Sequence, residues 1–192
     1  IEEQEWAGML EELAHWAEKS AISLRPFFAQ RKDGRFIREC HGDLHLRNLA
    51  WLDNGPLAFD CIEFNPDLRW IDVISEVAFL TMDLQDRQQP ALAQRFLNAY
   101  LENTGDYAGT RALTFYLLYR AMVRAKVAML GEHPDLDTFR RYLRLAQHYA
   151  RTPKPALLLM HGLSGSGKSY ISGQLVERID AIRIRSDIER KR

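Results

Sequence analysis

A short segment containing two prolines divides the sequence into two parts with different hydrophobic patterns. It spans residues 151–155 and has the composition of a linker. Before it, apolar residues recur mostly at the spacing of amphipathic helices. After it come a short apolar run, a loop rich in glycine and serine, and a further helical pattern, as at the start of a βαβ unit. We therefore expect two domains, residues 1–152 and residues 153–192.

The first part is expected to be mostly helical, with short strands near its middle. Helical spacing occurs over residues 3–20, 69–84, 90–102, 110–130 and 135–150, and strand-like runs occur over 36–37, 48–52 and 56–59. Asp53-Asn54-Gly55 between the last two runs is typical of a hairpin turn. Arg120 and Arg124 share one helix face, which we expect to face solvent. The predicted fold class is α+β, with an incomplete P-loop α/β unit at the end.

Charge and hydropathy argue against several classes of protein. The chain has 26 basic and 26 acidic residues, and this zero net charge disfavours a nucleic-acid partner. No apolar run approaches the ~20 residues that span a bilayer, and the acidic N-terminal segment lacks the core of a signal peptide. We therefore expect no membrane partner and a cytoplasmic protein. Cys40 and Cys61 fit neither a disulfide framework nor a metal pattern, and we expect them to be small buried side chains.

Polar residues suited to phosphoryl transfer are concentrated between residues 41 and 60. Residues 41–48 read HGDLHLRN, and Asp60 follows the predicted hairpin. The catalytic loop of protein kinases has an Asp and an Asn at the separation of Asp43 and Asn48. Phosphoryl transfer mainly requires positioning and charge neutralisation. Asp43 can hold an acceptor hydroxyl and accept its proton, while Asn48 and Asp60 offer the oxygen ligands that Mg²⁺ prefers.

This segment closely resembles the loop H-G-D-x-H-x-x-N of the aminoglycoside phosphotransferase family, a branch of the protein-kinase-like fold. The matching residues are His41, Gly42, Asp43, His45 and Asn48. The resemblance implies that ATP or GTP is used with Mg²⁺, that Asp43 is the catalytic base, and that Asn48 and Asp60 are magnesium ligands. His45 occupies the place of a phosphate-contacting Lys in protein kinases. His41 is a catalytic candidate that is also explained as a core histidine orienting the loop.

The resemblance covers roughly residues 1–150, as the larger lobe of a kinase-like enzyme, and the smaller lobe would precede Ile1. Asp72 is similar to an acidic residue that the family carries before a helix. We expect Asp72 to be structural, with its carboxylate accepting hydrogen bonds from backbone amides of the catalytic loop. Because the sequence does not begin with Met and ends soon after the second part starts, we expect a piece of a longer protein that is inactive alone.

Residues 162–169 read GLSGSGKS and match the phosphate-binding pattern G-x-x-x-x-G-K-[ST] in full. The context predicts a strand over 156–160, a helix over 168–178 and a second strand over 182–184. Glycines let backbone N–H groups turn toward phosphates, and the helix N-terminus adds partial positive charge. The residues expected to bind nucleotide are Gly162, Gly165, Ser166, Gly167, Lys168 and Ser169. Ser169 is also a candidate magnesium ligand.

The second part resembles P-loop small-molecule kinases of the gluconate kinase or zeta-toxin type. In these an acidic residue after the second strand often faces the acceptor, which makes Asp187 a candidate acceptor-binding residue. The whole sequence is similar to bacterial fusions of the two modules. It favours a phosphotransferase that moves the terminal phosphate of ATP or GTP to a hydroxyl of a small molecule. Two alternatives are a P-loop kinase with a regulatory kinase-like half, and a non-catalytic nucleotide-binding module.

Overall fold

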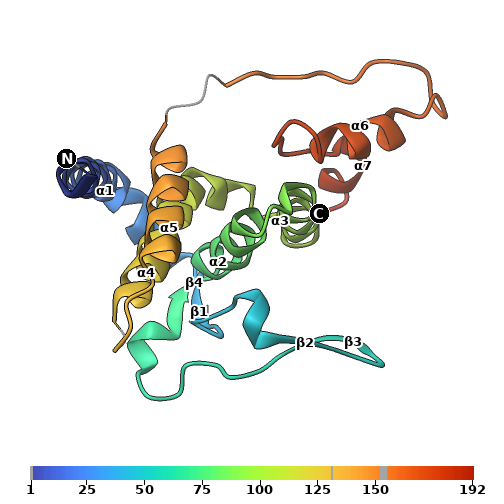
Figure 1. Ribbon diagram of the computed structural model, residues 1–192. Helices are drawn as coiled ribbons and strands as arrows, with labels where there is room; N and C mark the ends of the chain where they lie inside the picture. Colours follow the sequence, from blue (N-terminus) through green and yellow to red (C-terminus); the bar gives the residue numbers. More distant parts are fainter. Residues whose placement is uncertain (1, 131, 152–154) are drawn as a thin grey trace.

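The computed structural model describes residues 2–130, 132–151 and 155–192, so the predicted domain boundary at residues 152 and 153 lies outside the described residues. The helices are α1 (Glu2–Asp33), α2 (Val73–Asp86), α3 (Pro90–Thr104), α4 (Thr110–Met129), α5 (Leu136–Ala150), α6 (Lys168–Val176) and α7 (Ser186–Glu189). The strands are β1 (Ile37–Glu39), β2 (Leu49–Leu52), β3 (Gly55–Ala58) and β4 (Trp70–Asp72), and short 3-10 turns cover Leu46–Asn48, Pro66–Leu68 and Tyr107–Gly109. The described chain is thus α+β and mostly helical, as predicted (Figure 1).

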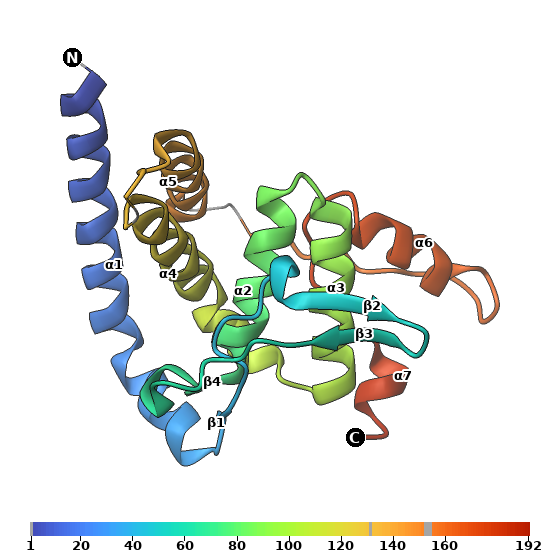
Figure 2. The same ribbon diagram turned by 60° about the horizontal axis from the view of Figure 1, so that its bottom comes forward.

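Helix α2 lies at the centre of the core, packed against α4 on one side and α3 on the other (Figures 1 and 2). Its side chains Ile74, Phe79 and Met82 are at most 1% exposed. Helices α4 and α5 form an antiparallel pair, and α1 runs alongside them (Figure 2). A helix that is apolar on nearly all sides must be enclosed by others. Burial of α2 therefore fixes the position of every loop that starts or ends on it.

Two predicted helix boundaries were wrong. Helix α1 does not end at residue 20 but continues through Pro26 to Asp33. The continuation is stabilised by tertiary contacts, because Phe27 and Arg31 are both buried. The helix predicted over 69–84 begins only at Val73, since β4 before it pairs antiparallel with β1.

The two small sheets are both antiparallel pairs. In the β1–β4 pair Ile37 lies opposite Asp72, and in the β2–β3 pair Leu49 lies opposite Ala58. The β2–β3 hairpin was predicted from its turn residues, and it projects from the helical body (Figure 1). Cys40 and Cys61 are free and only partly buried, which corrects the expectation of buried side chains. Both lie in loop segments beside the strands, where cover by other elements is incomplete.

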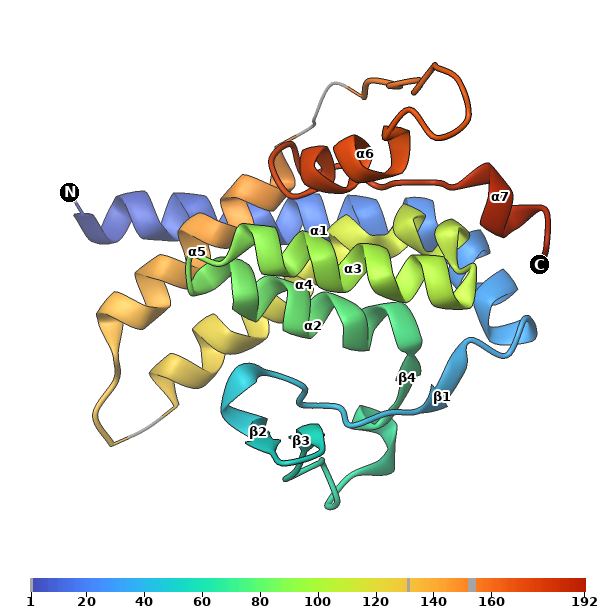
Figure 3. The same cartoon turned by 90° about the vertical axis from the view of Figure 1, so that its right-hand side faces the viewer.

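The strands predicted over 156–160 and 182–184 do not form in the described chain. Leu157 and Leu159 are each 82% exposed. A strand needs a neighbour for its backbone hydrogen bonds, and no described segment pairs with either run. The α/β unit is therefore represented by its helices alone, and α6 packs against α3 (Figure 3). None of the described helices combines the length and apolar character that crossing a membrane requires.

Candidate active site and phosphate-binding loop

Two buried charged side chains, one on α2 and one on α4, bind the backbone of the loop that joins β1 to β2. The N–H of Gly42 donates to Oε2 of Glu76 on α2 at 3.1 Å, and its C=O accepts from Nη1 of Arg120 on α4 at 3.0 Å. Gly42 has φ +84°, and a Cβ there would lie 2.8 Å from the carbonyl oxygen of Leu68. This position therefore requires glycine. A second acid of α2, Asp83, accepts from the N–H of Leu46 at 2.9 Å.

Arg120 corrects one expectation from the sequence. The face it shares with Arg124 is not solvated, because Arg120 is only 6% exposed and Arg124 is partly buried. Burial lowers the pKa of Arg120 and raises the pKa of Glu76, while the attraction between the two opposes both shifts. The guanidinium also lies 4.6 Å from the ring centroid of Phe79. Helix packing against α2 turned this face inward.

Asp43 lies at the surface end of the loop, with its side chain 38% exposed. Its Oδ2 accepts a hydrogen bond from Nδ2 of Asn48 at 3.2 Å and lies 3.4 Å from Nε2 of His45. The hydrogen bond from His45 is the largest cause that lowers the pKa of Asp43, and burial opposes it. The carboxylate is therefore ionised at neutral pH. The same Nδ2 of Asn48 also donates to the backbone oxygen of Asp43 at 3.0 Å.

The two histidines have different surroundings. The Nε2 of His41 lies 2.7 Å from the carbonyl oxygen of Phe59, so this nitrogen donates the bond. His41 thereby ties the loop to the residue before Asp60, which agrees with an orienting role. His45 is 6% exposed and stands edge-on to the ring of Phe79, with centroids 5.7 Å apart. The Nδ1 atoms of both histidines are buried and lack a hydrogen-bond partner among the described residues.

Asp60 is exposed and has φ +60°, a backbone conformation that non-glycine residues rarely adopt. The N–H of the preceding Phe59 donates to the backbone oxygen of Asn48 at 3.0 Å, so the backbones beside Asn48 and Asp60 are joined. Within the described residues no group of three or more His, Cys, Asp or Glu could hold a metal. A site built from Asn48 and Asp60 would offer one amide oxygen and one carboxylate. Oxygen ligands of this kind fit Mg²⁺, which keeps several waters.

A cavity of about 400 Å³ opens beside Asp43. Gly42, Asp43 and Arg120 are among its lining residues, and four aromatic rings form part of its apolar wall beside aliphatic side chains. These rings belong to Phe79, Phe115, Tyr116 and Tyr119. The cavity was not predicted from the sequence. Three of its rings, Phe115, Tyr116 and Tyr119, lie within one stretch of five residues inside the helix predicted over 110–130.

Asp72 is structural, but its partners differ from those expected. It caps α2 by accepting from the N–H of Ile74 at 3.1 Å, and it contacts no backbone amide of the catalytic loop that the structure describes. Its two oxygens accept from Arg31 at 2.6 and 2.7 Å. Arg31 also donates to both oxygens of Asp106, at 2.7 and 2.8 Å. The loop amides are bound instead by Glu76 and Asp83, two acids that were not predicted. Both lie in the part of α2 that is buried on all sides.

The glycine-rich loop curls around the ammonium group of Lys168. Gly162, Gly165 and Gly167 all have positive φ, and Gly167 is the N-cap of α6. The Nζ of Lys168 donates to the carbonyl oxygen of Gly162 at 2.7 Å and also to that of Leu163. The backbone at Ser166 closes a turn onto Leu163 at 3.2 Å. The loop therefore turns backbone carbonyl oxygens toward the ammonium group of Lys168.

Two remaining candidates lie near this loop. The backbone oxygen of Ser169 accepts from Nη1 of Arg183 at 3.3 Å. Asp187 lies in the first turn of α7 and pairs with Arg185 at 2.8 Å, which lowers the pKa of its exposed carboxylate. Figure 3 shows α2 and α3 between the β2–β3 hairpin and α6. The candidate residues thus form two separate groups, one on each side of these helices.

Two family models match separate parts of the chain. The model of the phosphotransferase enzyme family matches residues 3–113, and a model described as AAA domain matches residues 157–192. Uncharacterized proteins of Mycobacterium bovis and of two Mycobacterium tuberculosis strains are 31% identical over 188 residues. That alignment covers 96% of this chain and 38% of each relative, so the chain spans well under half of their length. No solved structure matches the chain. The family match extends over more than half of the sequence, and the chain therefore belongs to the phosphotransferase enzyme family, with an AAA-type segment joined to it.

Proposed function

We propose that the site around Asp43 transfers the terminal phosphate of ATP or GTP to a hydroxyl group of a small molecule. The observation that carries the proposal is the position of Asp43. Its ionised carboxylate is held by Asn48 and His45 at the edge of an aromatic-walled cavity. A hydroxyl in this cavity could donate its hydrogen bond to Asp43, which orients the oxygen for attack and accepts the proton as the new bond forms.

Asn48 and Asp60 are the residues proposed to hold Mg²⁺ near this carboxylate. When bound, Mg²⁺ would neutralise charge on the phosphates. The support within this chain is the hydrogen bond of Asn48 to Asp43, which directs the NH₂ end of the amide inward and leaves its oxygen available as a ligand. The backbone bond between Phe59 and Asn48 keeps Asp60 on the neighbouring segment.

The aromatic rings that line the cavity would contact the molecule that accepts the phosphate. Rings from α2 and α4 can cover a small molecule and exclude water from the oxygen that attacks. Glu76 and Arg120 are positioning residues in this proposal, because they bind the N–H and the C=O of Gly42, the residue before Asp43, without contacting the acceptor hydroxyl.

A second proposal concerns the glycine-rich loop, where Lys168 and Ser169 would bind a nucleotide and Mg²⁺. It is favoured by the positive-φ glycines and by the enclosed ammonium of Lys168. Phosphates entering the loop would replace the two carbonyl oxygens that Lys168 now contacts. Asp187 would face an acceptor only after leaving its pair with Arg185. Under this alternative the P-loop part carries the chemistry and the Asp43 part is regulatory.

Transfer of labelled γ-phosphate from Mg-ATP to a panel of small hydroxyl compounds tests the first proposal. Asp43→Asn should lower transfer by at least about 10²-fold, the usual contribution of a positioned base. Asp53→Asn, in the exposed hairpin turn, is the matched control and should leave transfer unchanged. Full transfer by Asp43→Asn would refute the proposed role, and loss of transfer in Lys168→Ala alone would favour the P-loop alternative.

Calorimetric titration of Mg-ATP into the 192-residue chain separates the two nucleotide sites. If heat of binding is lost with Lys168→Ala only, the nucleotide is held by the P-loop part. If it is lost with Asp60→Ala only, the nucleotide is held beside Asp43.

A further inference from the structure

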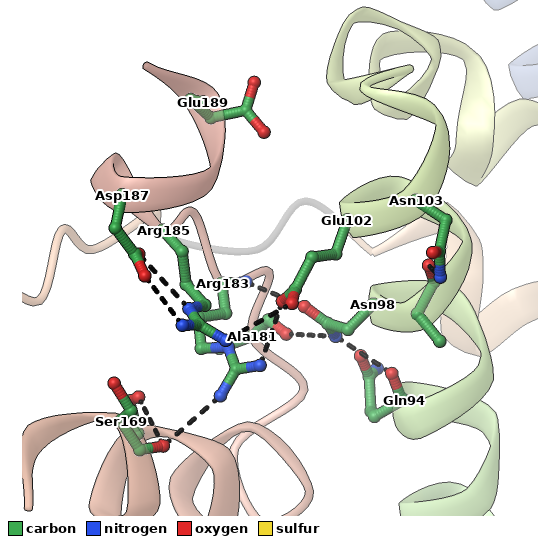
Figure 4. Close-up of polar contacts among 12 residues, drawn as sticks. Gln94, Asn98, Glu102, Asn103, Ser169, Ala181, Arg183, Arg185, Asp187 and Glu189 are labelled. Carbon is green, nitrogen blue, oxygen red and sulfur yellow. Dashed lines mark hydrogen bonds and ion pairs between the residues drawn. The ribbon is translucent and has the colours of Figure 1, made fainter. Parts of the chain in front are cut away.

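The outer face of α3 binds the segment that follows α6. Asn98, on this face, is only 8% exposed. Its Nδ2 donates to the carbonyl oxygen of Ala181 at 3.0 Å, and its Oδ1 accepts from the N–H of Arg183 at 2.7 Å (Figure 4). An amide that bonds the C=O of one residue and the N–H of the residue two positions later reproduces the hydrogen bonds of a neighbouring strand. One helical side chain therefore fixes both the position and the register of this segment.

Glu102 lies one turn further along α3 and binds two arginines of the same segment. Its Oε2 lies 3.0 Å from Nη2 of Arg183, and its Oε1 lies 3.4 Å from Nη1 of Arg185 (Figure 4). The backbone oxygen of Glu102 accepts from Arg192 at 2.8 Å. The carboxylate side chain is 22% exposed, so these contacts are partly shielded from solvent.

Contacts nearer the N-terminus of α3 extend the interface. Gln94 donates to Asp180 at 3.1 Å, and Arg95 pairs with Glu177 at 2.9 Å. The polar face of α3 thus complements the backbone and the charges of residues 177–192 over several turns. Complementary charges fix the register of an interface more than its strength.

Arg183 connects this interface to the glycine-rich loop. Its Nη2 binds Glu102 on α3, while its Nη1 donates to the backbone oxygen of Ser169 in the first turn of α6 at 3.3 Å. Ser169 is the residue whose hydroxyl is proposed to bind Mg²⁺. A change in the first turn of α6 therefore reaches α3 through one guanidinium group.

The opposite face of α3 packs on α2. Leu97 and Leu101 of α3 share one core cluster with Phe79 and Met82 of α2. Helix α2 in turn carries the two acids that bind amides of the loop around Asp43. The two candidate sites are therefore linked by a series of contacts that are buried between α3 and α2 and partly exposed at Glu102, Arg183 and Ser169.

We propose that α3 is the interface between the two modules and that it couples occupation of the P-loop to the Asp43 part through Arg183 and Glu102. The proposed coupling depends on the proposed nucleotide site at Lys168. The interface at α3 does not depend on it. Nucleotide in the loop fixes the first turn of α6 and the Ser169 carbonyl. The bond from Arg183 then strengthens its pairing with Glu102. By reciprocity, the intact pair must favour nucleotide binding.

Hydrogen exchange without nucleotide tests the interface itself. In the 192-residue chain the amide of Arg183 should be protected, and Asn98→Ala should speed its exchange about tenfold, as expected for loss of two ordinary hydrogen bonds. Asn103→Ala is the matched control, because the exposed side chain of Asn103 bonds only within α3. Exchange of the Arg183 amide at the rate of an unstructured peptide, or equal rates in Asn98→Ala and wild type, would overturn the interface.

Mg-ATP affinity tests the coupling. Glu102→Gln should weaken the binding of Mg-ATP about fivefold. This is the lower end of ordinary coupling between sites, and we expect it because the Glu102 carboxylate is partly exposed. Glu18→Gln, an exposed carboxylate on α1, should leave the affinity unchanged. In Arg183→Gln the Glu102→Gln change should have no further effect, since the pair is already broken. Unchanged affinity in Glu102→Gln would refute the coupling. Absence of Mg-ATP binding by wild type would refute the P-loop site and the coupling together, leaving exchange to decide the interface.

Discussion

Replacing Arg31 by Met should destabilise the fold more than any substitution at an exposed position of α1. Arg31 is 2% exposed and makes four hydrogen bonds of 2.6–2.8 Å to the carboxylates of Asp72 and Asp106. Burial disfavours its charge, but the hydrogen bonds and attraction of the two acids outweigh this and raise its pKa. Removing it would leave two buried carboxylates without their cation.

The expected loss of stability in Arg31→Met depends on the hydrogen bonds that Asp72 and Asp106 keep. Removing one partner of a buried ion pair costs about 3–5 kcal/mol. Asp72 would keep the N–H of Ile74, and Asp106 would keep the hydroxyl of Tyr100 and the N–H of Gly109. These remaining donors place the cost near the middle of the range, at about 4 kcal/mol. Since domains of this size are stable by only about 5–15 kcal/mol, the variant should be close to unfolding.

Urea unfolding measured by far-UV circular dichroism gives the free energies. Arg25→Met, at an exposed position of the same helix, should stay within about 0.5 kcal/mol of wild type. Adding Asp72→Asn and Asp106→Asn to Arg31→Met should restore part of the loss, because the amides carry no charge. A loss below about 1 kcal/mol in Arg31→Met would refute the claim that this cation neutralises both acids.

Two further predictions concern the loop around Asp43 and the residue that precedes it. Gly42→Ala should cost about 1–3 kcal/mol of stability from backbone strain, and the added Cβ, 2.8 Å from the Leu68 carbonyl oxygen, should cost further stability. Gly55→Ala is the control, because Gly55 has φ +111° but a Cβ there would meet no atom within 4 Å. Unfolding curves should therefore show a smaller loss of stability for Gly55→Ala. Burial, helped by nearby acids, raises the pKa of Cys40 from 9.0 to about 11. In a Cys61→Ser variant, alkylation of Cys40 by iodoacetamide should stay slow at pH 9 and accelerate toward pH 11. The pKa of Cys40 is higher in the folded than in the unfolded chain. The contribution of its protonated thiol to the stability of the fold is therefore full below pH 9 and is lost as pH rises through 11. Rapid alkylation at pH 8 would contradict this.

The parts of the fold that could be predicted are those set by neighbouring residues. The β2–β3 hairpin followed from its turn sequence, and the last three long helices followed from their spacing. Pairing of β4 with β1 could not be predicted, because its partners lie more than thirty residues apart. The strand expected over 156–160 failed for a related reason, since apolar composition alone supplies no hydrogen-bonding neighbour.

The same division holds for the candidate site. The pattern around Asp43 and Asn48 marked the loop, but nothing local indicated which distant side chains hold it. Glu76 and Arg120 come from two different helices and meet only at Gly42. Arg120 was expected on a solvated face that it shares with Arg124. Packing of α4 against α2 buried Arg120 instead, and no local pattern in the sequence indicated that contact.

The amide of Asn98 has a consequence for how strands can be added to the second module. It occupies the carbonyl of Ala181 and the N–H of Arg183, which face the same way along the chain. Backbone groups of successive residues in a strand point in opposite directions, so in a strand formed here those of Ile182 and Ile184 would face away from α3. A sheet built on this segment can therefore grow from one edge only. The helix acts as a permanent edge cap, which protects that side from pairing with another chain.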